Sequence, residues 1–199
     1  MTGDFVDPYF DPNIGDLRNL LGATSPAELR ALEPQAVFAN ELELPDLRLA
    51  RSDDLTELCA IHAQLFKSVY DWAGHIRTVD IKKNRDDAGF FLPVGYIERA
   101  SGFLFGELAD EDGLKGLNKD KFVERLAYYY DQLNYIHPFR EGNGRTQRVF
   151  WTRVAADAGY LIDWDAVVGD ENDRASRAAM EDDDRTVLVA MLERIVRAG

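Results

Sequence analysis

The chain has 199 residues, 46% of them hydrophobic, and a formal net charge of −13 at pH 7. This length supports one well-packed core and is short for two, so we expect a single domain over residues 1–199. The negative charge argues against a nucleic-acid-binding surface, because contacts with a phosphate backbone require clustered Lys and Arg. The sequence has no apolar run long enough to span a membrane and no signal-like start. We therefore expect a cytoplasmic protein with no membrane or nucleic-acid partner.

Helical periodicity dominates the chain. Apolar residues recur three and four positions apart over residues 55–72, 122–136, 146–159 and 187–198, and this spacing predicts amphipathic helices. Ser25 followed by Pro26 and Glu28 is typical of an earlier helix start with proline in its first turn. Gly159 stands where a glycine would close the third of these helices. The sequence therefore predicts a mostly α fold, a helical bundle.

Residues 76–92 are the exception to this helical pattern. IRTVDI alternates as a strand does, NRDDAG supplies turn residues, and FFLP resumes an extended run. The pattern predicts a short β-hairpin. Because an isolated two-stranded hairpin is marginally stable in water, this one must lean on the helices or act as a movable cover.

Residues 137–148 read HPFREGNGRTQR and combine a histidine, a carboxylate, arginines and two glycines around an asparagine. The Gly142-Asn143-Gly144 stretch would break a helix, so it predicts a tight turn leading into a new helix near Arg145. His137 and Pro138 would end the helix before it. A turn at a helix N-terminus is a site for anions such as phosphate.

These twelve residues resemble the signature of Fic-domain proteins, H-P-F-x-[D/E]-G-N-G-R-x-x-R, and meet every specified position. Residues 65–84 resemble the family's helix-to-flap segment, residues 90–97 its flap exit, and residues 9–33 the start of stand-alone bacterial Fic toxins. The resemblance implies a Fic-domain helical bundle in which the hairpin is a flap beside the active-site loop. Its parts would be an N-terminal extension over about 1–50, a core over 51–160 with the flap at about 76–93, and C-terminal helices over 161–199.

The loop chemistry suits transfer of a nucleotidyl group. The unperturbed pKa of a histidine side chain is near 6.5, so His137 can act as a general base, the role the resemblance also assigns to it. Glu141 offers a hard oxygen ligand for Mg²⁺. The predicted nucleotide-binding residues are Arg140, Gly142, Asn143, Gly144, Arg145, Thr146, Gln147, Arg148 and, near the flap tip, Lys83 and Asn84. In this set the Asn143 amide can donate to an α-phosphate oxygen, and Arg145 and Arg148 can present guanidinium forks to the β- and γ-phosphates.

Two sequence features bear on activity within the family. Death-on-curing toxins, which transfer phosphate, carry lysine where this chain has Gly144, so glycine favours AMP transfer. Many Fic proteins carry an inhibitory helix with the pattern [S/T]-x-x-x-E-[G/N], and the sequence contains no such pattern. Inhibition would then come in trans, from a small antitoxin whose helix reaches Arg148. The acidic flap turn NRDDAG differs from the Lys- and Gly-rich turn expected of relatives.

The resemblance thus implies a protein adenylyltransferase that moves AMP from ATP to a Tyr, Thr or Ser hydroxyl of a target protein with Mg²⁺. It would be the toxin of a toxin–antitoxin pair, and a type II topoisomerase subunit is among the targets implied. One alternative keeps the fold and transfers another phosphate-containing group, such as phosphate, UMP or phosphocholine. The other is a non-catalytic nucleotide-binding adaptor. Intact His137 and Glu141 argue against the adaptor.

Overall fold

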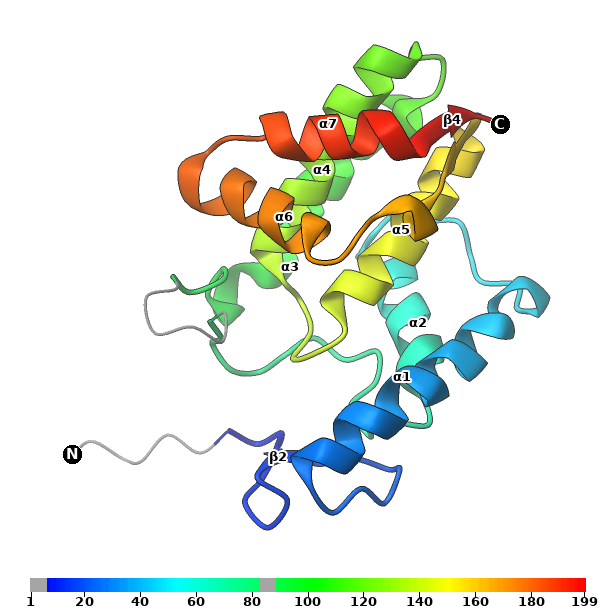
Figure 1. The fold of residues 1–199 in the computed structure, drawn as a ribbon. Helices are drawn as coiled ribbons and strands as arrows, with labels where there is room; N and C mark the ends of the chain where they lie inside the picture. Colours follow the sequence, from blue (N-terminus) through cyan, green and yellow to red (C-terminus); the bar gives the residue numbers. More distant parts are fainter. Residues whose placement is uncertain (1–6, 83–88) are drawn as a thin grey trace.

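The computed structural model describes residues 7–82 and 89–199, and over these ranges it is mostly helical, as predicted (Figure 1). The α-helices are α1 Pro26–Leu42, α2 Leu55–Phe66, α3 Ile97–Asp110, α4 Lys119–Ile136, α5 Asn143–Asp157, α6 Glu171–Asp182 and α7 Thr186–Ile195. Short 3₁₀ turns occur at η1 Leu44–Asp46, η2 Val94–Tyr96, η3 Asp112–Leu114 and η4 Trp164–Ala166. The strands are β1 Phe10–Asp11, β2 Asp16–Leu17, β3 Tyr160–Ile162 and β4 Val196–Ala198, which pair as two small antiparallel hairpins.

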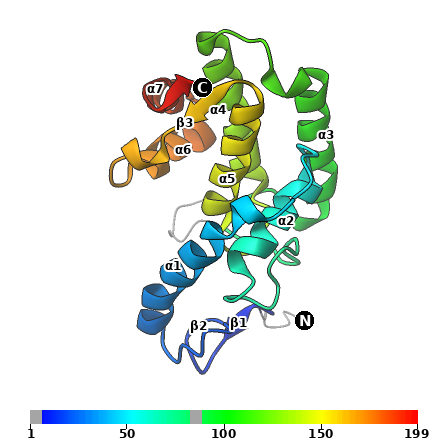
Figure 2. The ribbon, with the colours of Figure 1, turned by 90° about the vertical axis from the view of Figure 1, so that its right-hand side faces the viewer.

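The helices α4 and α5 form the centre of the molecule. Helix α4 packs against α3, α5, α6 and α7, whereas α5 packs against α2, which in turn carries α1. Figures 1 and 2 show α1 and α2 at one end and α6 and α7 at the other. The turn between α4 and α5 therefore lies where the two groups of helices meet.

Most predicted helix ends are confirmed. Ser25 caps α1, accepting a hydrogen bond from the Glu28 backbone N–H at 3.3 Å, and Pro26 is the first residue of the helix. Helix α4 ends just before His137, and Gly159 follows α5 with a φ of 86°. Helix α5 begins at Asn143, two residues earlier than predicted, so the asparagine belongs to its first turn.

Two predicted helices are shorter than expected. The predicted helix 55–72 ends at Phe66, where the backbone N–H groups of Val69 and Tyr70 both bond to the Phe66 carbonyl in a turn. The predicted helix 187–198 ends at Ile195, because Val196–Ala198 pairs with Tyr160–Ile162 as a strand. Periodicity missed both ends because tertiary packing buries the apolar residues that follow.

The strand predicted over IRTVDI is wrong. Residues 76–81 form no strand, and the two arms of the predicted hairpin meet at one antiparallel bridge, Lys82 with Phe90. The alternation failed because Arg77 is not a surface residue: its side chain is 1% exposed and binds backbone carbonyls in the interior. The predicted flap-tip residues Lys83 and Asn84 lie outside the described residues.

One cluster of buried side chains joins the helices into a common core. It includes Phe66 from α2, Tyr130 from α4, and Phe150 and Trp151 from α5, all fully buried. Burial of such large aromatic groups contributes strongly to folding. Across residues 7–82 and 89–199, no helix has the length and apolar character needed to cross a membrane.

Candidate active site at the turn between α4 and α5

His137 caps α4 in the left-handed conformation, with φ 48° and ψ 64°, a region that non-glycine residues seldom adopt. Its Nδ1 lies 3.0 Å from the carbonyl oxygen of Asn134. Since a carbonyl oxygen can only accept, Nδ1 carries a proton, and in the neutral ring Nε2 is the basic nitrogen. The ring stacks on Phe91, with centroids 3.7 Å apart. Nε2 is therefore the nitrogen that can take a proton from a hydroxyl.

Arg77 holds the backbone around this histidine. Its Nε donates to the His137 carbonyl at 2.8 Å, and its two terminal nitrogens donate to the carbonyls of Val79 and Leu92. Its own backbone N–H donates to the Pro138 carbonyl at 2.9 Å. One buried guanidinium thus fixes the histidine and both arms that lead to the predicted flap. The sequence did not identify Arg77 as a site residue, because the alternating segment around it indicated a strand.

The loop after the histidine is closed by a glycine and an asparagine. Gly142 has a φ of 82°, and a Cβ there would lie 2.3 Å from the Phe66 ring, so only glycine fits. The Asn143 side chain accepts from the Phe139 backbone N–H at 2.9 Å and donates to the Phe139 carbonyl at 2.8 Å. The amide predicted to bind phosphate is therefore engaged within the loop here, and its phosphate contact stays a prediction.

A buried histidine supports the same loop from below. His62 accepts a hydrogen bond at Nδ1 from the Gly74 backbone N–H at 2.7 Å, so its Nε2 donates to the Glu141 carbonyl at 3.1 Å. Its ring stacks between Phe66 and Phe139, at 4.7 and 3.9 Å. Burial lowers the pKa of His62 to about 3. His62 is fully buried, and the residue whose carbonyl it binds, Glu141, belongs to the candidate site.

Two arginines of the motif are paired with acids from the N-terminal part of the chain. Arg140 donates through two nitrogens to Asp7, at 2.8 and 2.9 Å. Arg145 pairs with Glu33 of α1 and lies over the Phe66 ring. The local excess of positive charge visible in the sequence is thus partly neutralised by residues more than a hundred positions away.

The rest of the predicted nucleotide set lies along α5. Thr146 is fully buried and its hydroxyl donates to the Gly142 carbonyl at 2.9 Å, which makes it a structural residue of the turn. Gln147 is 4% exposed and faces the cavity beside the turn. Arg148 is half-buried, and its charge acts on the buried phenol of Tyr130.

A cavity of about 990 Å³ opens beside the turn. The motif contributes His137, Arg140, Glu141, Gly142, Asn143, Gly144 and Gln147 to its lining. Other parts of the chain contribute Phe10, Asp16, Leu17, Ile81, Lys82, Phe91 and Asn134, and α6 adds Asn172, Asp173, Ser176 and Arg177. Sequence reasoning assigned no role to α6, because nothing in its local pattern shows that it faces the motif. The predicted Arg145 and Arg148 do not line this cavity, so their phosphate contacts stay predictions.

The residues at the turn fit an anionic ligand held with a magnesium ion. The first backbone N–H groups of α5 lack helical partners and lie at the positive end of the helix. The Glu141 carboxylate is 46% exposed at the cavity, and one of its oxygens accepts from the Gly142 backbone N–H at 2.9 Å. In the described part of the chain, no cluster of three or more ionisable ligands could hold a metal. One carboxylate completed by substrate phosphates is, however, a usual way for proteins to bind Mg²⁺.

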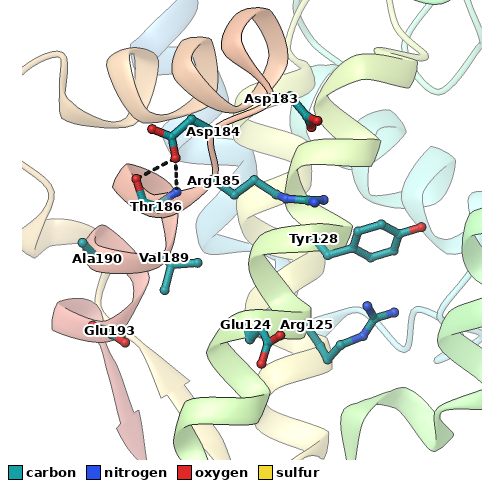
Figure 3. A pocket seen from close by; sticks show the side chains of 10 residues that line it. All are labelled: Glu124, Arg125, Tyr128, Asp183, Asp184, Arg185, Thr186, Val189, Ala190 and Glu193. Atoms are coloured by element: carbon teal, nitrogen blue, oxygen red, sulfur yellow. Dashed lines mark hydrogen bonds between the residues drawn. The ribbon is translucent and has the colours of Figure 1, made fainter.

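A second cavity, of about 500 Å³, lies between α4 and the start of α7 and contains no motif residue (Figure 3). Two of its arginines flank Tyr128: Arg125 at 4.5 Å and Arg185 at 5.4 Å from the ring centroid. Arg125 forms a two-nitrogen pair with Glu111, and Arg185 lies 3.8 Å from Asp131. Because this cavity contains none of the motif residues, the motif cavity is the candidate active site.

Comparison with known proteins agrees with this geometry. The model of the Fic/DOC family matches residues 52–155. Protein adenylyltransferase VbhT of Bartonella schoenbuchensis is 42% identical over 85% of the chain, which corresponds to 35% of VbhT. The probable protein adenylyltransferase Fic of Escherichia coli is 36% identical over 98% of the chain and 94% of its own length, and that of Salmonella typhimurium is 40% identical over 83% and 80%.

Solved structures confirm the predicted Fic-domain bundle. BepC of Bartonella tribocorum, with bound AMPPNP, superposes with a TM-score of 0.88 at 24% identity, covering 96% of this chain and 97% of BepC. The N-terminal Fic domain of a Bartonella quintana protein, with bound ADP, gives 0.86 at 26% identity, covering 96% and 94%. The family model, the relatives that align almost end to end and the shared fold together show that the chain belongs to the Fic/DOC family.

Proposed function

We propose that the chain is a protein adenylyltransferase that moves AMP from ATP to a Tyr, Thr or Ser hydroxyl of a target protein. The observation that carries this proposal is the position of His137: its Nδ1 is bound to the Asn134 carbonyl, and the residue lines a cavity that also contains the start of α5. A base and an anion site therefore share one space. The names of the relatives support the same activity.

His137 would accept the proton of the target hydroxyl at Nε2 as the hydroxyl oxygen attacks the α-phosphorus. A new phosphate ester bond forms, the bond between the α-phosphorus and the bridging oxygen breaks, and pyrophosphate leaves. Arg77 fixes the His137 carbonyl and Phe91 stacks on its ring, so the imidazole is held in one orientation before substrate binds. Such pre-organisation lowers the barrier by sparing the reaction an ordering step.

The N-terminus of α5 would bind the α-phosphate. Gly144 is exposed at the cavity with no atom near its missing Cβ, so the backbone is open to a phosphate there. Glu141 would hold Mg²⁺ together with phosphate oxygens, and the metal would offset the charge of the leaving pyrophosphate. Arg140 and Arg145 would contribute further positive charge if the phosphates replaced Asp7 and Glu33 as their partners.

For the biological role we propose the toxin of a toxin–antitoxin pair, with a type II topoisomerase subunit as a candidate target. Support comes from the absence of the pattern [S/T]-x-x-x-E-[G/N] in the sequence. A small partner protein would supply the missing glutamate to Arg148. Co-purification of a small protein encoded beside this chain, and its loss with Arg148→Ala, would support this; growth arrest unaffected by the partner would refute it.

A transferase of another phosphate-containing group remains the second candidate, because the same cavity could hold other phosphate donors. The experiment that separates the two is incubation of the chain with bacterial lysate, Mg²⁺, and ATP labelled at either the α- or the γ-phosphate. Protein labelled only from α-labelled ATP would establish AMP transfer. Label only from γ-labelled ATP would make the chain a phosphotransferase, and no label from either would favour the adaptor.

A further inference from the structure

His62 lies on α2, outside the motif, and its ring reaches the motif loop 79 positions further along the chain. The side chain is fully buried and does not line the motif cavity, so it cannot touch a substrate there. Both ring nitrogens are bonded, one to Gly74 and the other to Glu141. His62 therefore connects α2 and the turn at Gly74 with the candidate metal ligand.

The direction of these two hydrogen bonds follows from the partners. The Gly74 backbone N–H can only donate, so Nδ1 accepts, and the Glu141 carbonyl can only accept, so Nε2 donates. The turn that carries Gly74 is tightly packed: its φ is 83°, and a Cβ there would lie 2.7 Å from the Ala63 side chain. The Gly74 donor is thus held in place, and it fixes one end of the imidazole.

Aromatic rings hold the faces of the same imidazole. Phe66 stacks on it at 4.7 Å and Phe139 at 3.9 Å between centroids. Phe139 belongs to the motif, and the Phe66 ring lies where a Cβ of Gly142 would be, 2.3 Å away. In such a close-packed interior the imidazole cannot turn without displacing its neighbours. His62 therefore offers Glu141 a hydrogen-bond donor in a fixed position.

Glu141 is a residue whose direction matters. Its carboxylate is 46% exposed at the motif cavity, and a side chain of this kind loses rotamer freedom when it binds a metal. The carbonyl and the side chain belong to the same residue. Because the carbonyl is bonded to His62 in the interior, the side chain is directed outward to the cavity.

We infer that His62 is a positioning residue for the metal ligand: by fixing the Glu141 backbone, it holds the carboxylate where Mg²⁺ bound to the phosphates of ATP needs it. The inference rests on the proposed function for the presence of the metal. Removal of a group that orients a metal ligand typically weakens metal binding by about 10- to 100-fold. Since His62 does not line the cavity, its effect should appear only through Glu141.

The test is calorimetric binding of ATP to the full chain with Mg²⁺ and, separately, with EDTA, because the ratio of the two affinities measures the contribution of the metal. We expect a ratio of about ten or more in the wild type and of about one in Glu141→Ala. His62→Phe keeps an aromatic ring and removes both hydrogen bonds. It should reduce the ratio to about three or less and leave the affinity in EDTA unchanged. His62→Gln, whose amide can accept from Gly74 and donate to Glu141, should retain most of the ratio.

A double-mutant cycle separates positioning from a general disturbance of the fold. In the Glu141→Ala background, His62→Phe should not weaken binding of ATP with Mg²⁺ any further, because the residue through which it acts is gone. Tyr160→Phe is the matched control: the Tyr160 hydroxyl also donates to a backbone carbonyl, that of Leu117 at 2.8 Å, and its ring stacks on Phe122, away from the motif cavity. It should leave the ratio as in the wild type. Thermal unfolding shows which variants are folded, and His62→Leu serves where His62→Phe is not.

A ratio in His62→Phe equal to that of the wild type would overturn the inference. An equal loss of ATP affinity with and without Mg²⁺ would also overturn it, because His62 would then support the loop in general. The proposed function fails separately. A chain whose ratio depends on Glu141 and His62, but which labels no protein from α-labelled ATP, would support the inference and refute AMP transfer. A chain that transfers AMP and loses the ratio only in Glu141→Ala would support the function and refute the role of His62.

Discussion

The two cavities that flank α4 differ in how their polar groups are satisfied. In the α4–α7 cavity the arginines Arg125 and Arg185 are paired with acids and with Tyr128, and no lining residue has a buried unpartnered polar atom in the described structure. In the motif cavity three such atoms occur, next to a strained histidine and a helix N-terminus. The volume of a cavity therefore does not by itself identify a functional site. Buried polar atoms without hydrogen-bond partners and a strained backbone conformation are better indicators.

Loss of the carboxylate at the motif cavity should have the largest effect. Glu141→Ala should reduce AMP transfer by about 100-fold or more, because the metal would lose its protein ligand. Chelation of Mg²⁺ in the wild type should do the same. The comparison variant is Glu193→Ala in the α4–α7 cavity, which should transfer at the wild-type rate. AMP transfer is measured as protein label from α-labelled ATP. Comparable losses of transfer in both variants would show that the two cavities do not differ in function.

Of the two glycines in the loop, Gly142 should be the one whose substitution lowers the stability of the fold most. Gly142→Ala should lower the free energy of unfolding by about 2 kcal/mol or more, since the new Cβ meets the Phe66 ring in a conformation that favours glycine. Gly144→Ala should be neutral or slightly stabilising, because that position is helical with open space around it. Urea unfolding of the two variants measures the difference, and equal stabilities would contradict the structure of the turn.

The buried His62 should make stability depend on pH between about 6.5 and 3. Its pKa is lowered to about 3 in the folded chain, so on acidification the unfolded state binds a proton before the folded state does. Stability present above pH 6.5 should therefore fall as the pH drops, by at most about 1.4 kcal/mol per pH unit. His62→Gln should flatten this slope in urea unfolding. An unchanged slope would show that His62 is not the group responsible.

The smallest effect should come from the paired arginine of the second cavity. Arg125→Met breaks a half-exposed ion pair with Glu111 and a contact with Tyr128, together worth about 0.5–1.5 kcal/mol. Thermal unfolding should shift slightly, while the affinity for ATP should equal that of the wild type. A loss of ATP affinity would mean that the α4–α7 cavity also serves the nucleotide.

The sequence predicted the parts of the site that are contiguous in the chain. The end of α4 at His137, the turn through Gly142 and a following helix were all visible in twelve residues, because glycine and the order of residue types determine local backbone structure. The helical bundle was predictable from periodicity. The family resemblance of the motif was confirmed by the matching family model.

The supports of the site could not be predicted, because they depend on contacts between distant segments. Asp7 pairs with Arg140 from 133 positions away, and Glu33 with Arg145 from 112. Arg77 lay in an alternating segment that indicated a strand, yet its guanidinium is buried against the His137 carbonyl. Helix α6 contributes polar residues to the lining of the motif cavity, but in the sequence these residues look like the solvent-exposed face of any helix. Only the fold shows that Ser176 faces the motif.

The most direct test of the account is transfer from α-labelled ATP by His137→Ala beside the wild type, with ATP affinity measured on the same samples. The account predicts that label on the target falls by about 100-fold or more, as expected for loss of a general base. It also predicts that ATP affinity changes by no more than a few-fold, because the imidazole acts on the hydroxyl and not on the bound nucleotide. Target label at the wild-type rate in His137→Ala would contradict the account.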